Sequence, residues 1–189
     1  MNKIIVFLFL LINSSLLGAK EYQFNNYEIA SSSYEFLKFE SESTKLGIFT
    51  TDFDGYAKKY EVNFKRNKKY IEDISVVIES SSFDTDNSSR DEKMNEKILH
   101  SEKFETITFS SKNKINLEVL EQEITGNLVV RGVGQNIILK VVIEHSNESI
   151  SIKGRTTISL KKFKIPDPSI AIASVRDEFD LSFRVKISE

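Results

Sequence analysis

Regular alternation of apolar and polar residues constrains this chain more than any other feature of its sequence. The alternation is clearest near the C-terminus, where Phe179, Leu181, Phe183, Val185 and Ile187 are separated by polar or charged residues. Successive side chains leave opposite faces of a β-strand, so one face of this segment should be buried and the other exposed to water. The segment therefore predicts a half-buried strand.

Similar alternation recurs in short segments along most of the chain. These segments cover residues 34–39, 49–57, 60–64, 74–80, 106–110, 124–130, 136–145 and 149–160. Turn-forming residues separate them, at 66–68, 131–134, 146–148 and 166–168. This spacing favours antiparallel hairpins, and a sheet of about eight strands leaves two exposed edges unless it closes. We expect an all-β, mainly antiparallel fold, an extended eight-stranded β-barrel in a single domain over residues 20–189.

One segment departs from the alternation and predicts a short helical insertion. Ser89 and Glu92 have the spacing of a capping box, with Ser89 as the N-cap. The helix is expected from Asp91 to about His100. Its apolar residues, at helical spacing, are Met94, Ile98 and Leu99.

The segment 136–144 carries apolar residues on both faces. Ile138 and Val142 lie on the face opposite to Ile137, Leu139 and Val141. An apolar stripe on the outer face needs a cover, which either the helix or a second subunit would supply. A homodimer is therefore one possible assembly.

The N-terminus has the pattern of a secretory signal peptide. A lysine at position 3 precedes an apolar run over residues 4–12, and small residues at 18 and 19 suggest cleavage after Ala19. The run is too short to span a bilayer, so no stable membrane insertion is expected after cleavage. The sequence contains no cysteine, which excludes lipoprotein attachment and disulfides. We expect a periplasmic protein, with secretion into the medium as the alternative. A buried strand or a membrane anchor is the weaker interpretation of this N-terminal segment.

The inventory for catalysis or metal binding is small. The only imidazoles are His100 and His145, and neither belongs to a hydrolase or metal-binding motif. Carboxylate pairs occur at Asp52 and Asp54, at Asp84 and Asp86, and at Asp177 and Glu178. Charge solvated in water explains each pair better than catalysis or cation binding. We expect no enzyme activity, no metal and no cofactor, with an enzyme centred on Asp84, Asp86 and Arg90 as the weaker alternative.

The charge balance does not indicate a nucleic-acid partner, because Lys and Arg total 26 against 28 Asp and Glu. What remains is the apolar interior of the barrel. A barrel of about eight strands is either filled by its own side chains or encloses one small ligand. The pattern alone leaves both possibilities open.

Three stretches together resemble the YceI-like, polyisoprenoid-binding family. The first combines residues 82–85, Arg90-Asp91 and 104–109, the second covers 125–133, and the third runs from 161–165 to 175–181. The resemblance extends over about residues 27–187. The departures from the family pattern are Glu105 for Pro, Ile98-Leu99 for a Phe pair, Leu160 for Arg, Lys164 for Gly, and Ser32-Ser33 for His-Ser.

The resemblance implies a lipocalin-like extended barrel, often dimeric and often periplasmic, that holds an isoprenoid or a fatty amide lengthwise. Arg90 and Asp91 match a pair found in the family, but a helix start with a local ion pair explains them more simply.

We therefore expect an exported carrier of a long-chain isoprenoid or fatty-acid-like lipid. The residues expected to line the ligand are Phe36, Phe53, Ile107, Phe109, Ile137, Leu139, Val141, Ile150, Ile152, Phe179, Leu181, Phe183 and Val185. The alternative is a secreted interaction module with a solid barrel, which binds another protein through loops such as 80–103.

Overall fold

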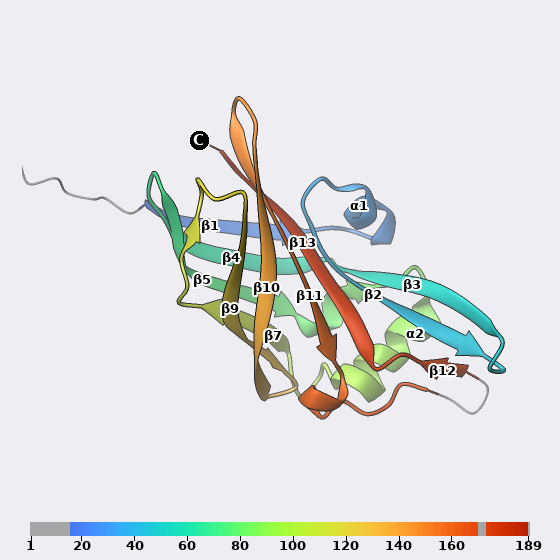
Figure 1. The fold of residues 1–189 in the computed structure, drawn as a ribbon. Helices are drawn as coiled ribbons and strands as arrows, with labels where there is room; N and C mark the ends of the chain where they lie inside the picture. Colours follow the sequence, from blue (N-terminus) through green and yellow to red (C-terminus); the bar gives the residue numbers. More distant parts are fainter. Residues whose placement is uncertain (1–15, 170–172, 189) are drawn as a thin grey trace, which may run out of the picture.

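The computed structural model describes residues 16–169 and 173–188, and its main element is one curled antiparallel sheet (Figure 1). The strands are β1 (Leu16–Gln23), β2 (Phe36–Lys45), β3 (Phe49–Ala57), β4 (Lys59–Arg66), β5 (Tyr70–Glu79), β6 (Phe83–Asp84), β7 (Thr106–Ser111), β8 (Ile115–Asn116), β9 (Glu121–Val130), β10 (Val133–His145), β11 (Ser149–Ser159), β12 (Ala173–Val175) and β13 (Glu178–Ser188). The helical segments are α1 (Tyr27–Ser32), α2 (Ser88–Lys93), the π-helix η2 (Met94–Leu99) and the 3-10 turns η1 (Ser80–Ser82) and η3 (Lys161–Phe163). The expected all-β, antiparallel fold is confirmed.

The sheet curls into a barrel because β3 and β4 form one nearly continuous run. The strand order is β1-β4-β5-β7-β9-β10-β11-β13-β2-β3-β6, so β3 and β4 lie near opposite ends of it. Only Lys58 separates them, and its backbone still donates to Ser82 O (3.1 Å) and accepts from Phe24 N (2.8 Å). Counting this run as one strand gives the eight long strands of the barrel, with β1 as an additional strand on β4.

Next to β1, side chains and not strand pairing complete the wall of the barrel. In the described residues, β2 pairs with β13 only from Asp180 to Arg184, and the last part of β13 faces β1 without strand pairing. Glu35 fills this seam: its Oε1 accepts from the backbone N of Lys186 (2.6 Å) and from the hydroxyl of Tyr22 (2.8 Å), and contacts Lys20. Lys20 Nζ also donates to Lys186 O (2.7 Å), so β1 is tied to β13 through a small polar network.

On the inner wall, phenylalanine rings lie over glycines of neighbouring strands. A Cβ on Gly154 would lie 2.1 Å from the ring of Phe183, and one on Gly126 would lie 2.1 Å from the ring of Phe109. The same relation holds between Gly55 and Phe39, at 2.4 Å. These rings therefore lie close to the sheet instead of filling the centre of the barrel.

The helical insertion is present, but its N-terminus and its form differ from the expectation. Asn87, not Ser89, is the N-cap, because its side chain accepts from Arg90 N (3.0 Å). After Lys93 the α-helix continues as the π-helix η2, which ends at His100 in a left-handed conformation. The second helix, α1, was not expected; it is capped by Asn26, which accepts from Ile29 N.

The β9–β10 hairpin agrees with the expected turn at 131–134. Val130 pairs with Val133, and Arg131 and Gly132 between them both have positive φ, the geometry of a tight two-residue turn. Farther along β10, Ile138 is 55% exposed, so no described element covers the outer apolar face there. A second subunit remains the predicted cover.

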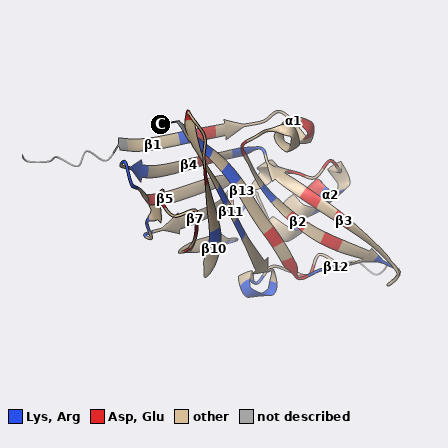
Figure 2. Ribbon diagram, turned by 45° about the horizontal axis from the view of Figure 1, so that its top comes forward, with Lys and Arg blue, Asp and Glu red and all other residues tan. Residues whose placement is uncertain are grey.

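Charged residues of both signs are spread along the strands and over the helical segments (Figure 2). Within residues 16–169 and 173–188, no helix is long and apolar enough to cross a bilayer. Residues 1–15 of the expected signal peptide lie outside the described residues, and the expected cleavage site after Ala19 falls within β1.

Candidate functional site

The barrel encloses a cavity of about 710 Å³. This volume lies within the range of roughly 300–1,000 Å³ that is usual for small-molecule sites. The cavity wall is mainly aliphatic and aromatic, with contributions from the long strands and from α2 and η2. The side chains of the barrel thus leave room for an apolar ligand.

Most residues that the sequence predicted as lining do border this cavity. They are Phe36, Phe53, Ile107, Phe109, Ile137, Leu139, Ile152, Phe179, Leu181, Phe183 and Val185. Val141 and Ile150 are buried in the core but are not part of the cavity wall. The pairing of β11 with β13 explains this agreement, since Ile152 lies opposite Val185 and both point inward.

Phe36 borders the cavity in a different way from the rest. It lies opposite Arg184, whose guanidinium carbon is 5.4 Å from its ring centre, and its ring also packs edge-on against Tyr56. Leu37 and Phe39, which have the opposite parity, pair with the inward residues Phe183 and Leu181. The ring of Phe36 therefore packs on the outer face of β2, while Leu37 and Phe39 belong to the inner face.

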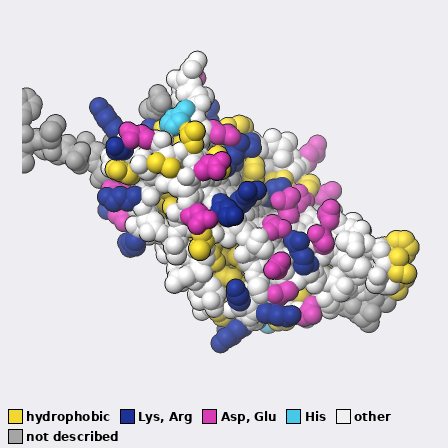
Figure 3. Space-filling view, viewed as in Figure 1, with side chains coloured by type: hydrophobic (Ala, Val, Ile, Leu, Met, Phe, Trp, Pro, Cys, Tyr) yellow, Lys and Arg dark blue, Asp and Glu magenta, His cyan; other side chains and the backbone are white. Residues whose placement is uncertain are grey.

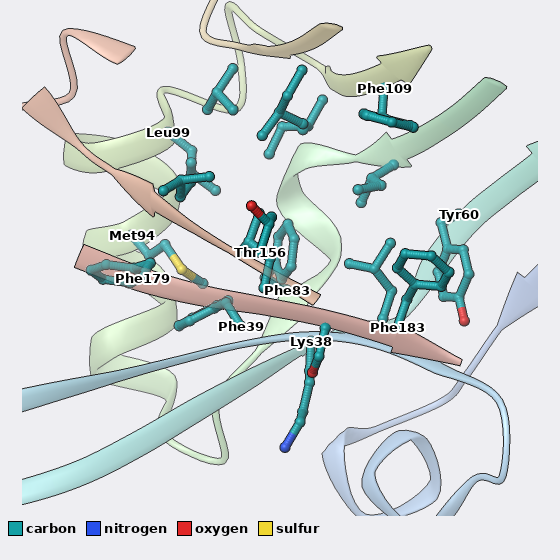
Figure 4. A pocket seen from close by; sticks show the side chains of 18 of the residues that line it. Lys38, Phe39, Tyr60, Phe83, Met94, Leu99, Phe109, Thr156, Phe179 and Phe183 are labelled. Carbon is teal, nitrogen blue, oxygen red and sulfur yellow. The ribbon is translucent and has the colours of Figure 1, made fainter. Parts of the chain in front are cut away.

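Four phenylalanines form an aromatic cluster at the end of the cavity next to α2. The ring centre of Phe39 lies 5.5 Å from that of Phe179, 5.6 Å from that of Phe83 and 6.2 Å from that of Phe53. Figure 4 shows Met94 beside Phe39 and Phe179, and shows Tyr60, Phe109 and Phe183 farther along the cavity. Tilted and edge-on ring contacts of this kind suit a rigid apolar wall.

The wall formed by β4 and β5 and the cover formed by the helix were not predicted from the sequence. The missed lining residues include Tyr60, Val62, Phe64, Ile71, Ile74, Val76, Ile78, Met94, Ile98 and Leu99. Alternation in 60–64 and 74–80 was itself the signal for the strand residues. For the helix, the apolar positions were recognised, but their contact with the barrel interior depends on how α2 and η2 cross its end.

Two hydroxyls of the wall, those of Tyr60 and Ser182, are buried without a hydrogen-bond partner in the described part of the chain. Tyr60 is only 4% exposed. Burial raises the pKa of the Tyr60 hydroxyl, and nearby Glu35 raises it further, so it stays protonated and able to donate.

Several charged lining residues lie at one end of the cavity. Lys93 and Lys97 come from the helical segment, Lys45 from the end of β2, and Asp167 from the loop after η3. Because these lysines are exposed to solvent and still border the cavity, the cavity opens to water here. We call this end the mouth.

Arg90 and Asp91, which begin the helix near the mouth, do not form the local ion pair that the sequence suggested. Asp91 Oδ1 accepts from the hydroxyl (2.7 Å) and the backbone N (3.1 Å) of Thr85. Burial raises the pKa of the Asp91 carboxyl, against the effect of these hydrogen bonds. The guanidinium of Arg90 instead lies over the ring of Phe53, 4.5 Å from its centre. Asp91 thus anchors the helix to the strand end, and Arg90 packs on the wall.

The other chemical candidates have structural partners. The ring Nε2 of His145 lies 2.9 Å from Leu117 O, Asp84 pairs with Lys58 at 3.0 Å, and Asp54 accepts from the hydroxyl of Tyr27 (2.7 Å). His100 has the left-handed backbone that ends η2. Within the described residues, no group of three or more His, Cys, Asp or Glu side chains is placed to hold a metal ion.

Comparison with known proteins identifies a family and a fold. The model of the YceI-like domain matches residues 27–187. BcnA from Burkholderia cenocepacia superposes with a TM-score of 0.66 at 16% identity, covering 80% of this chain and 96% of that one. The YCEI protein of Campylobacter jejuni gives 0.61 at 21% identity, covering 71% and 84% of the two chains. No curated protein matches the sequence.

A third solved structure is a polyisoprenoid-binding domain from Saccharophagus degradans that is implicated in plant cell wall breakdown. It superposes with a TM-score of 0.59 at 12% identity, covering 80% of this chain and 92% of that domain. At these levels of identity the three structures show a common fold. The matched segment, 27–187, contains the whole cavity wall described above.

Proposed function

Because this chain belongs to the YceI-like domain family, we propose that it is an exported, non-catalytic carrier that holds one long apolar molecule inside its barrel. The observation that carries the proposal is the open cavity of about 710 Å³ with its apolar wall. Removal of a hydrocarbon chain from water is favourable by about 0.8 kcal/mol per methylene, so a long tail needs few polar contacts.

A long-chain isoprenoid or a fatty-acid-like lipid is the ligand class that best suits this cavity. The polyisoprenoid-binding domain of similar fold supports an isoprenoid. Three departures from the family pattern, Ile98, Leu99 and Leu160, all lie in the cavity wall. Leu160 stands where the family has an arginine, so this wall is more apolar, and Ile98 and Leu99 are smaller than the Phe pair they replace. We expect ligand preference to differ from that of relatives with the usual residues.

The direct test is to identify what the purified protein contains and what it takes up. Native mass spectrometry before and after organic extraction should reveal a stoichiometric long-chain lipid. The emptied protein should then take up a long-chain isoprenoid quinone or hexadecanamide at one molecule per chain. Recovery of no lipid, together with no uptake of either compound, contradicts the carrier and supports the interaction module.

Two adjacent threonines of β11 provide a matched pair of variants. Thr156 borders the cavity, whereas Thr157 is exposed on the outer face, where it donates to Asp180 (2.6 Å). Thr156→Trp should place a large side chain in the cavity and reduce uptake by roughly tenfold or more, while Thr157→Trp should leave uptake unchanged. Equal uptake by both folded variants would show that the ligand binds elsewhere.

A further inference from the structure

The tip of the β2–β3 hairpin exposes three large apolar side chains at the mouth of the cavity. Leu46 is 70% exposed, Ile48 76% and Phe49 64%. In Figure 3 this tip is the group of hydrophobic atoms at the far right of the molecule. Isolated exposed apolar residues are normal, but three within four positions at a protruding tip need an explanation.

The conformation of the tip makes a purely structural explanation weak. Leu46 and Gly47 both have positive φ, 51° and 69°. Glycine accepts this conformation freely, whereas a leucine is strained in it and residues such as Asn fit better. Leu46 therefore combines an unfavourable backbone conformation with little burial, so its apolar side chain contributes little to the stability of the fold.

The tip is directly connected to the cavity. Lys45 and Phe49 are paired across the hairpin, and Lys45 together with Ser43 borders the cavity. The other side of β2 at this level pairs with β12, where Val175 also lines the cavity. A surface that engages the tip would therefore lie against the mouth.

The charges around the mouth indicate what kind of surface this is. Four cationic residues border the cavity there, Lys45, Arg90, Lys93 and Lys97, and Asp167 is the acidic lining residue. The whole chain has a net charge of -2, so this group of cations is a local feature. Apolar side chains that protrude beside exposed lysines are the combination by which peripheral proteins bind an anionic lipid surface.

From this geometry we propose that the β2–β3 hairpin tip docks on an anionic lipid bilayer and brings the cavity mouth against it. Leu46, Ile48 and Phe49 enter the interfacial region, and the lysines of the mouth contact lipid phosphates. Docking rests on the exposed tip and its charges alone. Its use, exchange of the apolar ligand between membrane and cavity without passage through water, rests on the proposed carrier function.

Vesicle flotation tests the docking. The probes are vesicles of phosphatidylcholine alone and of phosphatidylcholine with about a third phosphatidylglycerol. The wild-type chain should float with the mixed vesicles and less with the neutral ones. High salt should weaken flotation with the mixed vesicles more than flotation with the neutral ones, because salt screens the attraction between the lysines and the anionic lipid. A chain that floats with neither vesicle overturns the proposal.

The decisive variant replaces Leu46 by Asn, Ile48 by Ser and Phe49 by Thr. Asn tolerates positive φ and Thr suits a strand, so this variant should fold at least as well as the wild type. The matched control is Val119→Ser with Leu120→Ser, two exposed apolar residues in the loop between β8 and β9, at the opposite end of the barrel (Figure 1). The tip variant should bind mixed vesicles roughly tenfold more weakly or worse, and the control should bind like the wild type.

Two further measurements separate the possible outcomes. Uptake of hexadecanamide in vesicle-free solution should be the same for the tip variant and the wild type, because none of the three side chains lines the cavity. Absence of uptake by both the wild type and the tip variant would contradict the carrier function and leave the docking result standing.

Sedimentation should give the same molecular mass for the wild type and the tip variant. A dimer that the tip variant dissociates, with unchanged flotation, would show that a second copy covers the tip and would overturn membrane docking.

Discussion

Single residues on the inner wall decide how much room the cavity has. Gly154 is paired with Phe183, and the ring of Phe183 lies where a side chain at position 154 would begin. Leu160 and Lys164, two departures from the family pattern, affect the character of the wall and the backbone conformation. Leu160 puts an aliphatic side chain into the wall, whereas Lys164 has a positive φ of 55°, where the family's glycine would be unstrained.

Gly154→Ala should push the ring of Phe183 into the cavity. We expect a loss of about 1–3 kcal/mol in the free energy of unfolding, typical of overpacking, and weaker uptake of hexadecanamide. Chemical denaturation and native mass spectrometry measure the two effects. The control is Gly134→Ala, since a Cβ there meets only the amide of Asn127, at 3.3 Å. Equal stability of the two variants would mean that the ring of Phe183 adjusts without cost.

At the level of elements, the seam between β1 and β13 is the part of the wall that depends on side chains. Burial raises the pKa of the Glu35 carboxyl, but hydrogen bonds from Lys20, from the Lys186 amide and from Tyr22 outweigh it, so the pKa lies below its usual value of 4.5. A carboxyl with a lowered pKa stabilises the folded state above its unfolded pKa, and this contribution is lost as the pH falls through the folded pKa.

Glu35→Gln should therefore destabilise the protein at pH 7, by about 1–3 kcal/mol for lost hydrogen bonds to a charged acceptor. The difference from the wild type should shrink as the pH falls below about 4, where the wild-type carboxyl becomes protonated as well. Urea titrations at several pH values measure this difference in the free energy of unfolding. Glu21→Gln, which changes an exposed carboxyl of β1, should show no such difference. A pH-independent effect of Glu35→Gln would exclude the ionised carboxylate as its cause.

The sequence predicted most strands of the fold because one face of each is buried, as the pair Ile152 and Val185 illustrates. It predicted a closed barrel but not how the barrel closes, which depends on the continuation of β3 into β4 at Lys58 and on the contacts of Glu35 with a residue 151 positions away. The lining was only partly predicted, since Val141 has the correct inward parity but lies outside the cavity. Depth within a barrel depends on how strands stagger, which alternation along one strand does not reveal.

For the molecule as a whole, export remains a prediction, and β1 gives it a structural test. Cleavage after Ala19 would remove the first half of β1 and leave Lys20 and Tyr22, which both contact Glu35. Tyr22 also stacks on Tyr60, with ring centres 4.4 Å apart. The shortened strand would thus retain the contacts that close the seam.

Expression of the full chain in a Gram-negative host should therefore give a periplasmic protein that begins at Lys20. Cell fractionation and intact mass measurement check this expectation. Ala19→Arg should block cleavage, because signal peptidases require a small residue at this position. An unprocessed wild-type chain in the cytosol would contradict export, and the barrel's ligand would then have to come from another compartment.

Two parts of the barrel wall differ in what sets the spacing of their strands. Along the middle of β13, residues 36–40 of β2 pair with β13 and residues 38–45 of β2 pair with β3, so hydrogen bonds between backbones set the spacing there. Across the seam, the spacing between β1 and β13 follows the rotamers of Glu35, Lys20 and Tyr22. A change in the side-chain conformation of Glu35, Lys20 or Tyr22 would therefore alter the width of the barrel at the seam and leave the hydrogen-bonded part of the wall as it is.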